Sequence, residues 1–420
     1  MAALAGIADA GCRLTHFQLR MHVPKHLRDA GAAGVTVVVT TGVSLRDSRS
    51  ALNHALSHHR ARAAAGPAGP LEAMRMPRLY CTVGVHPQHV AEVGEKPEKI
   101  AQHLHNWCTE AGIPEAGSRR PAAGEIADGD GAPIVAIGLC GLDNAKCMAQ
   151  RAALRAQLEV AAARGLPAVV HAKAGLENDV LDELAPFLLA SAVPQTPSPS
   201  SPSTPTGAKS SQPRPRLPGA MLQGFSGDVE AARRAVALGV LLSASGVATR
   251  SRMKPLLNGV FGAPGVVPDA FLLVESCAPF LRPHFWGDAA PPKVPGRERV
   301  SEAGHQLCRP RHAVDTLDHI AAARRVPLAA LAATTAANWA RLFRRRVPAL
   351  PAGAEYRLTT PEDLLADPGY LPPPADQARL ERPVAPGPEA PTGSHGPAPA
   401  PLPYNRRGQN LPAKRTLNVR

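Results

Sequence analysis

Side chains that bind metal ions or transfer protons recur beside short apolar runs of this sequence. His86 and His171 directly follow two such runs, and Glu275 follows four apolar residues. Gln223 lies inside another run, and Cys277 stands two positions after Glu275. Taken singly, these residues have ordinary structural explanations: a histidine can be buried or stand in a turn, and a cysteine can be a small buried residue. A carboxylate behind an apolar run must be paired or hydrogen bonded where it is buried, so the shared placement indicates one functional site.

Eight short apolar runs alternate with stretches of helical spacing, and together they predict the elements that position these side chains. The runs cover 6–10, 35–40, 80–85, 134–138, 167–170, 220–225, 240–244 and 271–274, with helical spacing for example over 149–164 and 228–237. This alternation predicts a parallel sheet, and eight strands close a (β/α)8 TIM barrel. An open, doubly wound sheet also fits the strand count, although no glycine-rich phosphate fingerprint follows an early strand.

In a (β/α)8 barrel the carboxyl ends of all strands meet at one mouth, where the chemistry is built. The polar residues above therefore converge if the barrel interpretation is right. The first predicted strand ends near Asp9, and the fourth ends at Leu139, one residue past its apolar run, with Asp143 just beyond.

Two segments have compositions that predict disorder outside the barrel. Residues 193–218 are rich in Pro, Ser and Thr and contain no acidic residue, and residues 348–420 are rich in Pro and Ala. Such segments bury too little apolar surface to fold. We therefore expect a barrel domain over 1–347 with a disordered insertion at 193–218, followed by a disordered tail over 348–420.

The charge balance is strongly basic and permits a polyanionic partner. The chain has 47 Lys and Arg against 34 Asp and Glu, a formal net charge of +13. Such a field attracts nucleic acid, so DNA is a candidate partner, although a GC-rich genome would also raise the arginine content. The basic residues in the last twenty positions fit a nucleic-acid or nuclear-addressing extension, or simply a solvated tail. The sequence points to no particular protein partner.

Cysteine usage and hydropathy predict an intracellular protein, cytoplasmic or nuclear. The seven cysteines include no CxxC pair, which is typical of reduced thiols. No basic region precedes the short apolar stretch at the N-terminus, and no run of about 18 apolar residues occurs. We therefore expect neither a signal peptide nor a transmembrane segment.

Six motifs in a fixed order resemble the TatD-type deoxyribonucleases. They are YCTVGVHPQHV, IVAIGLCGLD, LPAVVHAKAG, GAMLQGFSGD, LLVESCAPFL and NWARLF, and the resemblance runs from about residue 7 to residue 345. DAGCRLT at 9–15 resembles the branch of this family that lacks the usual HxH pair. The family consists of amidohydrolase-like TIM barrels that use divalent metal to cut DNA phosphodiesters, so the resemblance implies this fold and this activity.

The resemblance also implies roles for individual residues. His86 and Glu275 take catalytic positions, and His171, Gln223 and Cys277 take metal-ligand positions. Leu139 stands where the family has its first metal-binding carboxylate, and Arg309 stands where a late motif has glutamate.

These replacements weaken a magnesium site, because magnesium prefers several oxygen ligands that usually include carboxylates. The remaining imidazole, amide and thiol groups would suit zinc at best. We therefore expect a divalent metal, Mg²⁺ or Zn²⁺, or no bound metal at all.

Three functions remain open at this point. An active nuclease would hold its metal on His171, with His86 assisting proton transfer or orienting the phosphate. A non-catalytic relative would keep the barrel as a scaffold or as a nucleic-acid- or protein-binding module. A third alternative is a different hydrolase with a Cys277 thiolate as its nucleophile, which would need an activating neighbour. The lost metal-ligand positions favour an impaired or inactive nuclease.

Overall fold

The computed structural model describes residues 3–65, 76–94, 96–115, 131–188, 216–263, 265–284, 307–360 and 363. Most of the predicted insertion, 193–215, and the tail from residue 364 lie outside these ranges.

Eight parallel strands form one sheet in which every strand pairs with the next strand along the chain. They are β1 (Ile7–Cys12), β2 (Val35–Thr41), β3 (Arg78–Val83), β4 (Ile134–Leu142), β5 (Ala168–Ala172), β6 (Ala220–Gln223), β7 (Leu241–Ala244) and β8 (Leu272–Val274). The Cys277 N–H donates to Gly11 O at 2.9 Å, so the segment after β8 meets β1 and nearly closes the ring. The barrel prediction is confirmed, and the open sheet is excluded.

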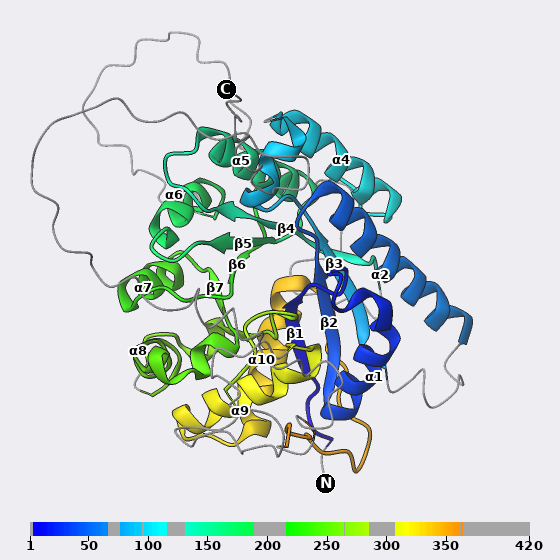
Figure 1. Cartoon of the computed structure of the whole chain (residues 1–420), viewed down its shortest axis with the longest axis vertical. Coiled ribbons are helices and arrows are strands. Elements are labelled where there is room, and N and C mark those ends of the chain that lie inside the picture. Colours follow the sequence, from blue (N-terminus) through cyan, green and yellow to red (C-terminus); the bar gives the residue numbers. More distant parts are fainter. Residues whose placement is uncertain are drawn as a thin grey trace, which may run out of the picture. The chain divides into compact units, whose positions relative to one another are not determined.

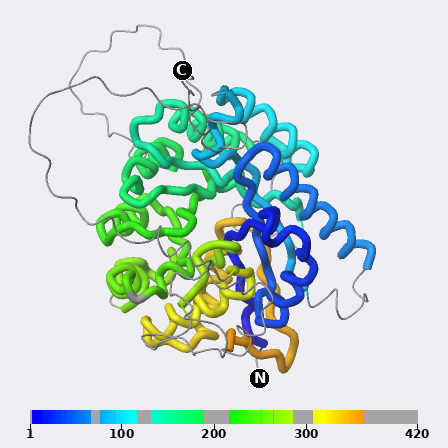
Figure 2. Tube along the Cα trace, viewed as in Figure 1, coloured from blue at the N-terminus to red at the C-terminus, as the bar shows by residue number. Residues whose placement is uncertain are grey.

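Helices surround this ring, as Figure 1 shows, and Figure 2 shows the chain passing around it in sequence order. The α-helices are α1 (Val23–Ala33), α2 (Leu45–Ala65), α4 (Pro97–Glu110), α5 (Met148–Arg164), α6 (Glu177–Leu188), α7 (Val229–Ala237), α8 (Lys254–Leu256), α9 (Ala313–Arg324) and α10 (Leu328–Phe343). Shorter helical turns are η1 (Arg20–His22), η2 (Pro87–Val93), η3 (Gly246–Thr249), η4 (Ser251–Met253), η5 (Leu257–Phe261), η6 (Asp269–Phe271) and η7 (Pro310–His312). Within the described ranges, no helix is long and apolar enough to cross a bilayer.

Aromatic side chains of α10 fill the barrel near the beginnings of the strands. Trp339 and Phe343 are buried with inward-facing residues of β1 to β4. The ring centroid of Trp339 lies 5.8 Å from that of Tyr80 and 5.0 Å from that of Phe343. Because this end is packed, the barrel can be open at the opposite mouth, where the strands end.

The folded part extends past the predicted boundary at residue 347. Leu350 is buried, and its N–H donates to Leu4 O at 2.8 Å. The Tyr356 hydroxyl donates to Ala5 O at 2.6 Å. Both the N–H and the hydroxyl of Thr359 donate to Asp315 of α9, at 2.7 and 2.8 Å. Residues 348–360 therefore pack on the barrel, although their Pro-rich composition predicts otherwise.

Strand β4 is longer than its apolar run predicts, and this matters for the site. The predicted run ends at residue 138, whereas β4 continues to Leu142. Gly141 pairs with His171 and Leu142 with Ala172 on β5. Leu139 therefore lies inside the strand, and Asp143 takes the place at its carboxyl end.

Candidate functional site

A cavity of about 260 Å³ opens at the carboxyl ends of the strands. It brings together five positions singled out from the sequence: His86, Leu139, His171, Gln223 and Cys277. The other lining residues are Cys12, Arg13, Thr41, Val43, Gln88, His89, Gly224, Ala278, Phe280 and Leu281. Glu275 and Arg309 are not among the lining residues.

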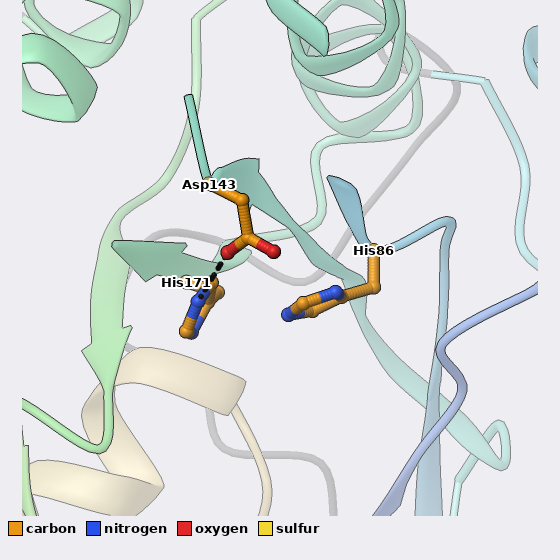
Figure 3. A group of neighbouring side chains, drawn as sticks. All are labelled: His86, Asp143 and His171. Atoms are coloured by element: carbon orange, nitrogen blue, oxygen red, sulfur yellow. Dashed lines mark hydrogen bonds and ion pairs between the residues drawn. The ribbon is translucent and has the colours of Figure 1, made fainter. Parts of the chain in front are cut away.

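Three side chains from neighbouring strand ends form a compact group within this mouth. His86, Asp143 and His171 each offer one ligand atom, and these atoms lie within 4.8 Å of one another. Figure 3 shows the three side chains converging, with Asp143 Oδ1 3.0 Å from His171 Nε2. The rings of His86 and His171 have centroids 4.6 Å apart. Two imidazoles and one carboxylate are a set that a divalent cation can use.

Asp143 is the member that the sequence did not assign to the metal. Asp143 stands just beyond the predicted end of the fourth strand, but the family resemblance places the metal-binding carboxylate position on Leu139. The segment from 134 to 142 is apolar apart from Gly138, Cys140 and Gly141. This pattern could have indicated that the strand continues to residue 142 and places Asp143 at its carboxyl end.

Residues of α5 position the loops that carry His86 and Asp143. Gln157 is buried, accepts the Val85 N–H at 2.7 Å and donates to Val85 O at 3.0 Å. Gln150 accepts the Asp143 N–H at 2.9 Å and donates to Pro87 O at 3.2 Å. These amides pair backbone groups that would otherwise be left unsatisfied, and they fix the loop geometry.

Burial keeps both imidazoles of the group uncharged at neutral pH. Burial, and then the neighbouring His171, lower the pKa of His86 to about 3. Burial also lowers the pKa of His171, although Asp143 opposes this shift. Because neutral imidazole is the form that binds metal, neither ring must lose a proton to bind one.

His86 is held at the start of η2. The backbone N–H of His86 donates to Val43 O at 2.8 Å, and its imidazole Nδ1 accepts the Gln88 backbone N–H at 3.3 Å. The latter contact is at the long end of the hydrogen-bond range. The contact would therefore be given up easily if His86 were to hold a cation.

Cys277 lines the cavity as a protonated thiol. Burial, and then the nearby carboxyl groups of Glu275 and Asp9, raise its pKa well above the usual value. Since the thiolate is the form that attacks carbon or phosphorus and binds metal, this environment disfavours both roles. It also removes support for the alternative in which Cys277 is a nucleophile.

Gln223 and Glu275 meet beneath the mouth against Gly11 of β1. A Cβ atom on Gly11 would lie 2.4 Å from Gln223 Nε2 and 2.5 Å from Glu275 Oε2. The Gly224 N–H donates to Glu275 Oε1. Burial, and to a lesser extent Asp9, raise the pKa of Glu275 to about 8. Glu275 is therefore mostly uncharged at neutral pH and supplies little negative charge for a cation.

Asp9 links β1 to the segment after β8. It accepts the Ser276 N–H at 2.8 Å and the Ser276 hydroxyl at 2.6 Å, and the Gly11 N–H at 3.3 Å. Burial raises its pKa to about 7, although these three bonds oppose the shift. Asp9 is absent from the cavity lining, so its bonds serve barrel closure.

The fold and the site define a (β/α)8 barrel with a histidine–carboxylate group at its mouth that can hold a divalent cation. Residues 8–344 match the family model described as TatD related DNase. The chain therefore belongs to the TatD-related DNase family.

The sequences of relatives align with this chain along the whole barrel. The 3'-5' ssDNA/RNA exonuclease TatD of Cronobacter sakazakii is 28% identical over 339 residues, which cover 80% of this chain and 97% of the relative. The protein of the same name from Escherichia coli K12 is 26% identical, with 80% and 98% covered.

Solved structures show the same fold. A TatD homologue from Escherichia coli K12 superposes with a TM-score of 0.53 at 20% identity, covering 80% of this chain and 97% of that one. A TatD-family hydrolase from Entamoeba histolytica gives a TM-score of 0.55 at 14% identity, with 81% and 99% covered.

Proposed function

We propose that this chain binds single-stranded DNA or RNA at the barrel mouth and that its phosphodiesterase activity is weak or lost. The relatives named above are single-strand exonucleases, and their whole length aligns with this barrel. The observation that carries the proposal is the cavity itself: Leu139, Gln223 and Cys277 line it together with His86 and His171. The three positions that resemble the family's metal ligands thus hold an alkyl group, an amide and a protonated thiol.

The remaining group can hold one cation. His86, Asp143 and His171 fit a divalent ion, and two imidazoles with one carboxylate suit zinc better than magnesium. Such an ion would act as a Lewis acid on a phosphoryl oxygen. Because both imidazoles are already uncharged at neutral pH, binding a cation would release no proton from them.

The surroundings of this group give little support for hydrolysis. Leu139 is nearly buried in the cavity wall and offers no atom to a second ion. Glu275 and Cys277 are predominantly protonated at neutral pH for the reasons above. Among the residues that the structure describes, the site therefore lacks the anionic ligands that would hold a second ion or orient an attacking water.

The test compares the purified protein with a triple variant, Leu139→Glu/Gln223→His/Cys277→Asp. Zinc, manganese and magnesium would be measured by elemental analysis, and trimming of a 3'-labelled single-stranded oligonucleotide would be followed in parallel. We expect the wild type to bind the oligonucleotide without cutting it appreciably, and the triple variant to gain bound metal and chelator-sensitive trimming. His171→Ala in the triple background serves as the control that should abolish the gain.

Two results would contradict this proposal separately. Chelator-sensitive trimming by the wild type at the rate of the triple variant would show that catalysis is intact. No binding of any single-stranded oligonucleotide at low salt would show that the mouth does not recognise nucleic acid.

A further inference from the structure

Large apolar side chains are exposed on the loops around the mouth. Phe17 and Met21, on the loop between β1 and α1, are 69% and 75% exposed. Phe280, after β8, is 51% exposed and also lines the cavity. An exposed apolar patch beside a cavity marks a binding surface.

The aromatic members of this surface contact one another across two loops. The ring of His16 lies 4.4 Å from that of Phe17, with the planes inclined by 39°. It lies 5.2 Å from the ring of Phe280, in an edge-to-face arrangement. We refer to His16, Phe17 and Phe280 as the aromatic platform. It joins the first and last loops of the barrel at the rim of the cavity.

The platform is held in place before any ligand arrives. Leu14 and Leu19, on either side of Phe17, are completely buried. The Leu19 N–H donates to His16 O at 2.9 Å, and the Phe280 N–H donates to Cys277 O at 2.9 Å. Both loops are thus pinned by buried side chains and backbone bonds while their rings stay exposed. A rigid aromatic surface loses little conformational entropy on binding.

A cavity-lining arginine that is ion-paired with Asp47 lies close to His16 of the platform. Arg13 lines the cavity, and its Nε donates to Asp47 Oδ2 at 3.2 Å. Burial, and then the charge of Arg13, lower the pKa of His16, so this ring is neutral at physiological pH and presents an uncharged π face. Exposed aromatic ring faces next to a cation match a nucleotide, whose base stacks on a ring and whose phosphate is anionic.

We propose that the aromatic platform stacks an unpaired base of single-stranded nucleic acid, while Arg13 faces the adjoining phosphate. This inference rests on the proposed function and adds the place where a base is bound. Stacking needs a π face but no particular hydrogen-bond pattern, so the platform accepts any base and favours single strands over duplexes, whose bases are already stacked.

The experiment measures the affinity of the full-length chain for a short labelled oligothymidylate by fluorescence anisotropy. Phe17→Ala and Phe280→Ala should each weaken binding by about 5- to 150-fold, the factor that corresponds to 1–3 kcal/mol per stacked base. Phe17→Trp should retain binding, whereas Phe17→Leu, which keeps apolar surface without a π face, should not. Met148→Ala is the matched control, because Met148 is 70% exposed at the start of α5 and outside the cavity lining.

A second oligonucleotide with abasic sites separates stacking from general attraction. It should bind the wild type and the Phe17→Ala/Phe280→Ala variant equally. If the double variant bound oligothymidylate as tightly as the wild type, or lost affinity for both oligonucleotides alike, the stacking proposal would be wrong. Self-association of the wild type that the double variant lacks, with unchanged oligonucleotide affinity, would identify a protein interface instead. A wild type that binds neither oligonucleotide would overturn the proposed function itself.

Discussion

Gln150 on α5 accepts the N–H of Asp143 at 2.9 Å, and its amide also donates to Pro87 O at 3.2 Å. One side chain thus holds the loop after β4 and the loop after β3 in fixed relation. These are the loops that bring Asp143 and His86 together. The geometry of the candidate cation group therefore depends on a residue outside it.

Replacing Gln150 by alanine should weaken cation binding without unfolding the barrel. Loss of a group that orients metal ligands commonly costs about 10- to 100-fold in metal affinity. We expect a loss in this range for Zn²⁺, measured by isothermal titration calorimetry. Gln88→Ala is the control, because Gln88 lines the cavity but contacts His86 through its backbone N–H. Unchanged zinc affinity in Gln150→Ala would show that the loops keep their positions without it.

Cys277 should react slowly with iodoacetamide although it borders the cavity. Its raised pKa leaves almost no thiolate at pH 7.5, and thiolate is the reactive form. Cys147, which is also partly exposed, provides an internal comparison. Mass spectrometry of partly alkylated protein should show modification at Cys147 before Cys277. Preferential labelling of Cys277 would instead restore the thiolate-nucleophile alternative.

Gly11→Ala should destabilise the protein because its methyl group has no space. The added carbon would overlap both Gln223 Nε2 and Glu275 Oε2, which lie under 3 Å from its position. Overpacking of this kind costs about 1–3 kcal/mol. The free energy of unfolding from urea titration should fall by that amount. Gly259→Ala is a suitable control, since its Cβ would meet the exposed Val229 side chain at 3.2 Å and, apart from its own helix, nothing else in the described part of the chain within 4 Å. Equal stability of the two variants would contradict the close packing at Gly11.

The barrel could be predicted from the sequence because each strand is a short apolar run and the strands follow one another in sequence order. The positions of His86, His171, Gln223 and Cys277 at one mouth follow directly from that topology. Their shared location needed no knowledge of side-chain contacts.

The sequence did not predict the properties that depend on burial and on loop geometry. Asp143 received no ligand role because the family resemblance placed the carboxylate position on Leu139, and the glycines at 138 and 141 concealed the continuation of β4 to Leu142. The protonation of Glu275 follows from a buried neighbourhood shared with Asp9, residues that are 266 positions apart in the chain, and no local pattern shows it. Residues 348–360 pack on the barrel through single contacts such as the Tyr356 hydrogen bond to Ala5. The overall composition of the segment, which is rich in Pro, does not indicate such contacts.

His26 should make the protein sensitive to acid. Burial, and then Arg309, lower its pKa to about 4 from 6.5. In the described part of the chain neither ring nitrogen has a hydrogen-bond partner. As the pH falls, the His26 imidazole becomes protonated in the unfolded chain before it does so in the folded protein. The free energy of unfolding is therefore unaffected by protonation of His26 above pH 6.5 and decreases as the pH falls from 6.5 toward 4. The loss amounts to about 3 kcal/mol at most.

The variant His26→Leu should remove this part of the acid sensitivity. Urea titrations between pH 7.5 and pH 4.5 should show a smaller decrease in unfolding free energy for His26→Leu than for the wild type. His103→Leu, at an exposed position of α4, should behave like the wild type. Parallel pH profiles for all three proteins would assign the acid response to other groups.

Two truncations should separate the packed C-terminal segment from the residues beyond it. A chain that ends at residue 363 keeps the buried Leu350, the Tyr356 bond to Ala5 and the Thr359 bonds to Asp315. A chain that ends at residue 347 loses all of them and uncovers apolar surface beside β1. Burying one leucine contributes about 1.5–3 kcal/mol and each hydrogen bond about 1 kcal/mol, so the shorter chain should be less stable by at least about 3 kcal/mol. Thermal unfolding should show a lower midpoint for the chain ending at 347 and an unchanged one for the chain ending at 363; equal midpoints for both would mean that residues 348–360 do not stabilise the barrel.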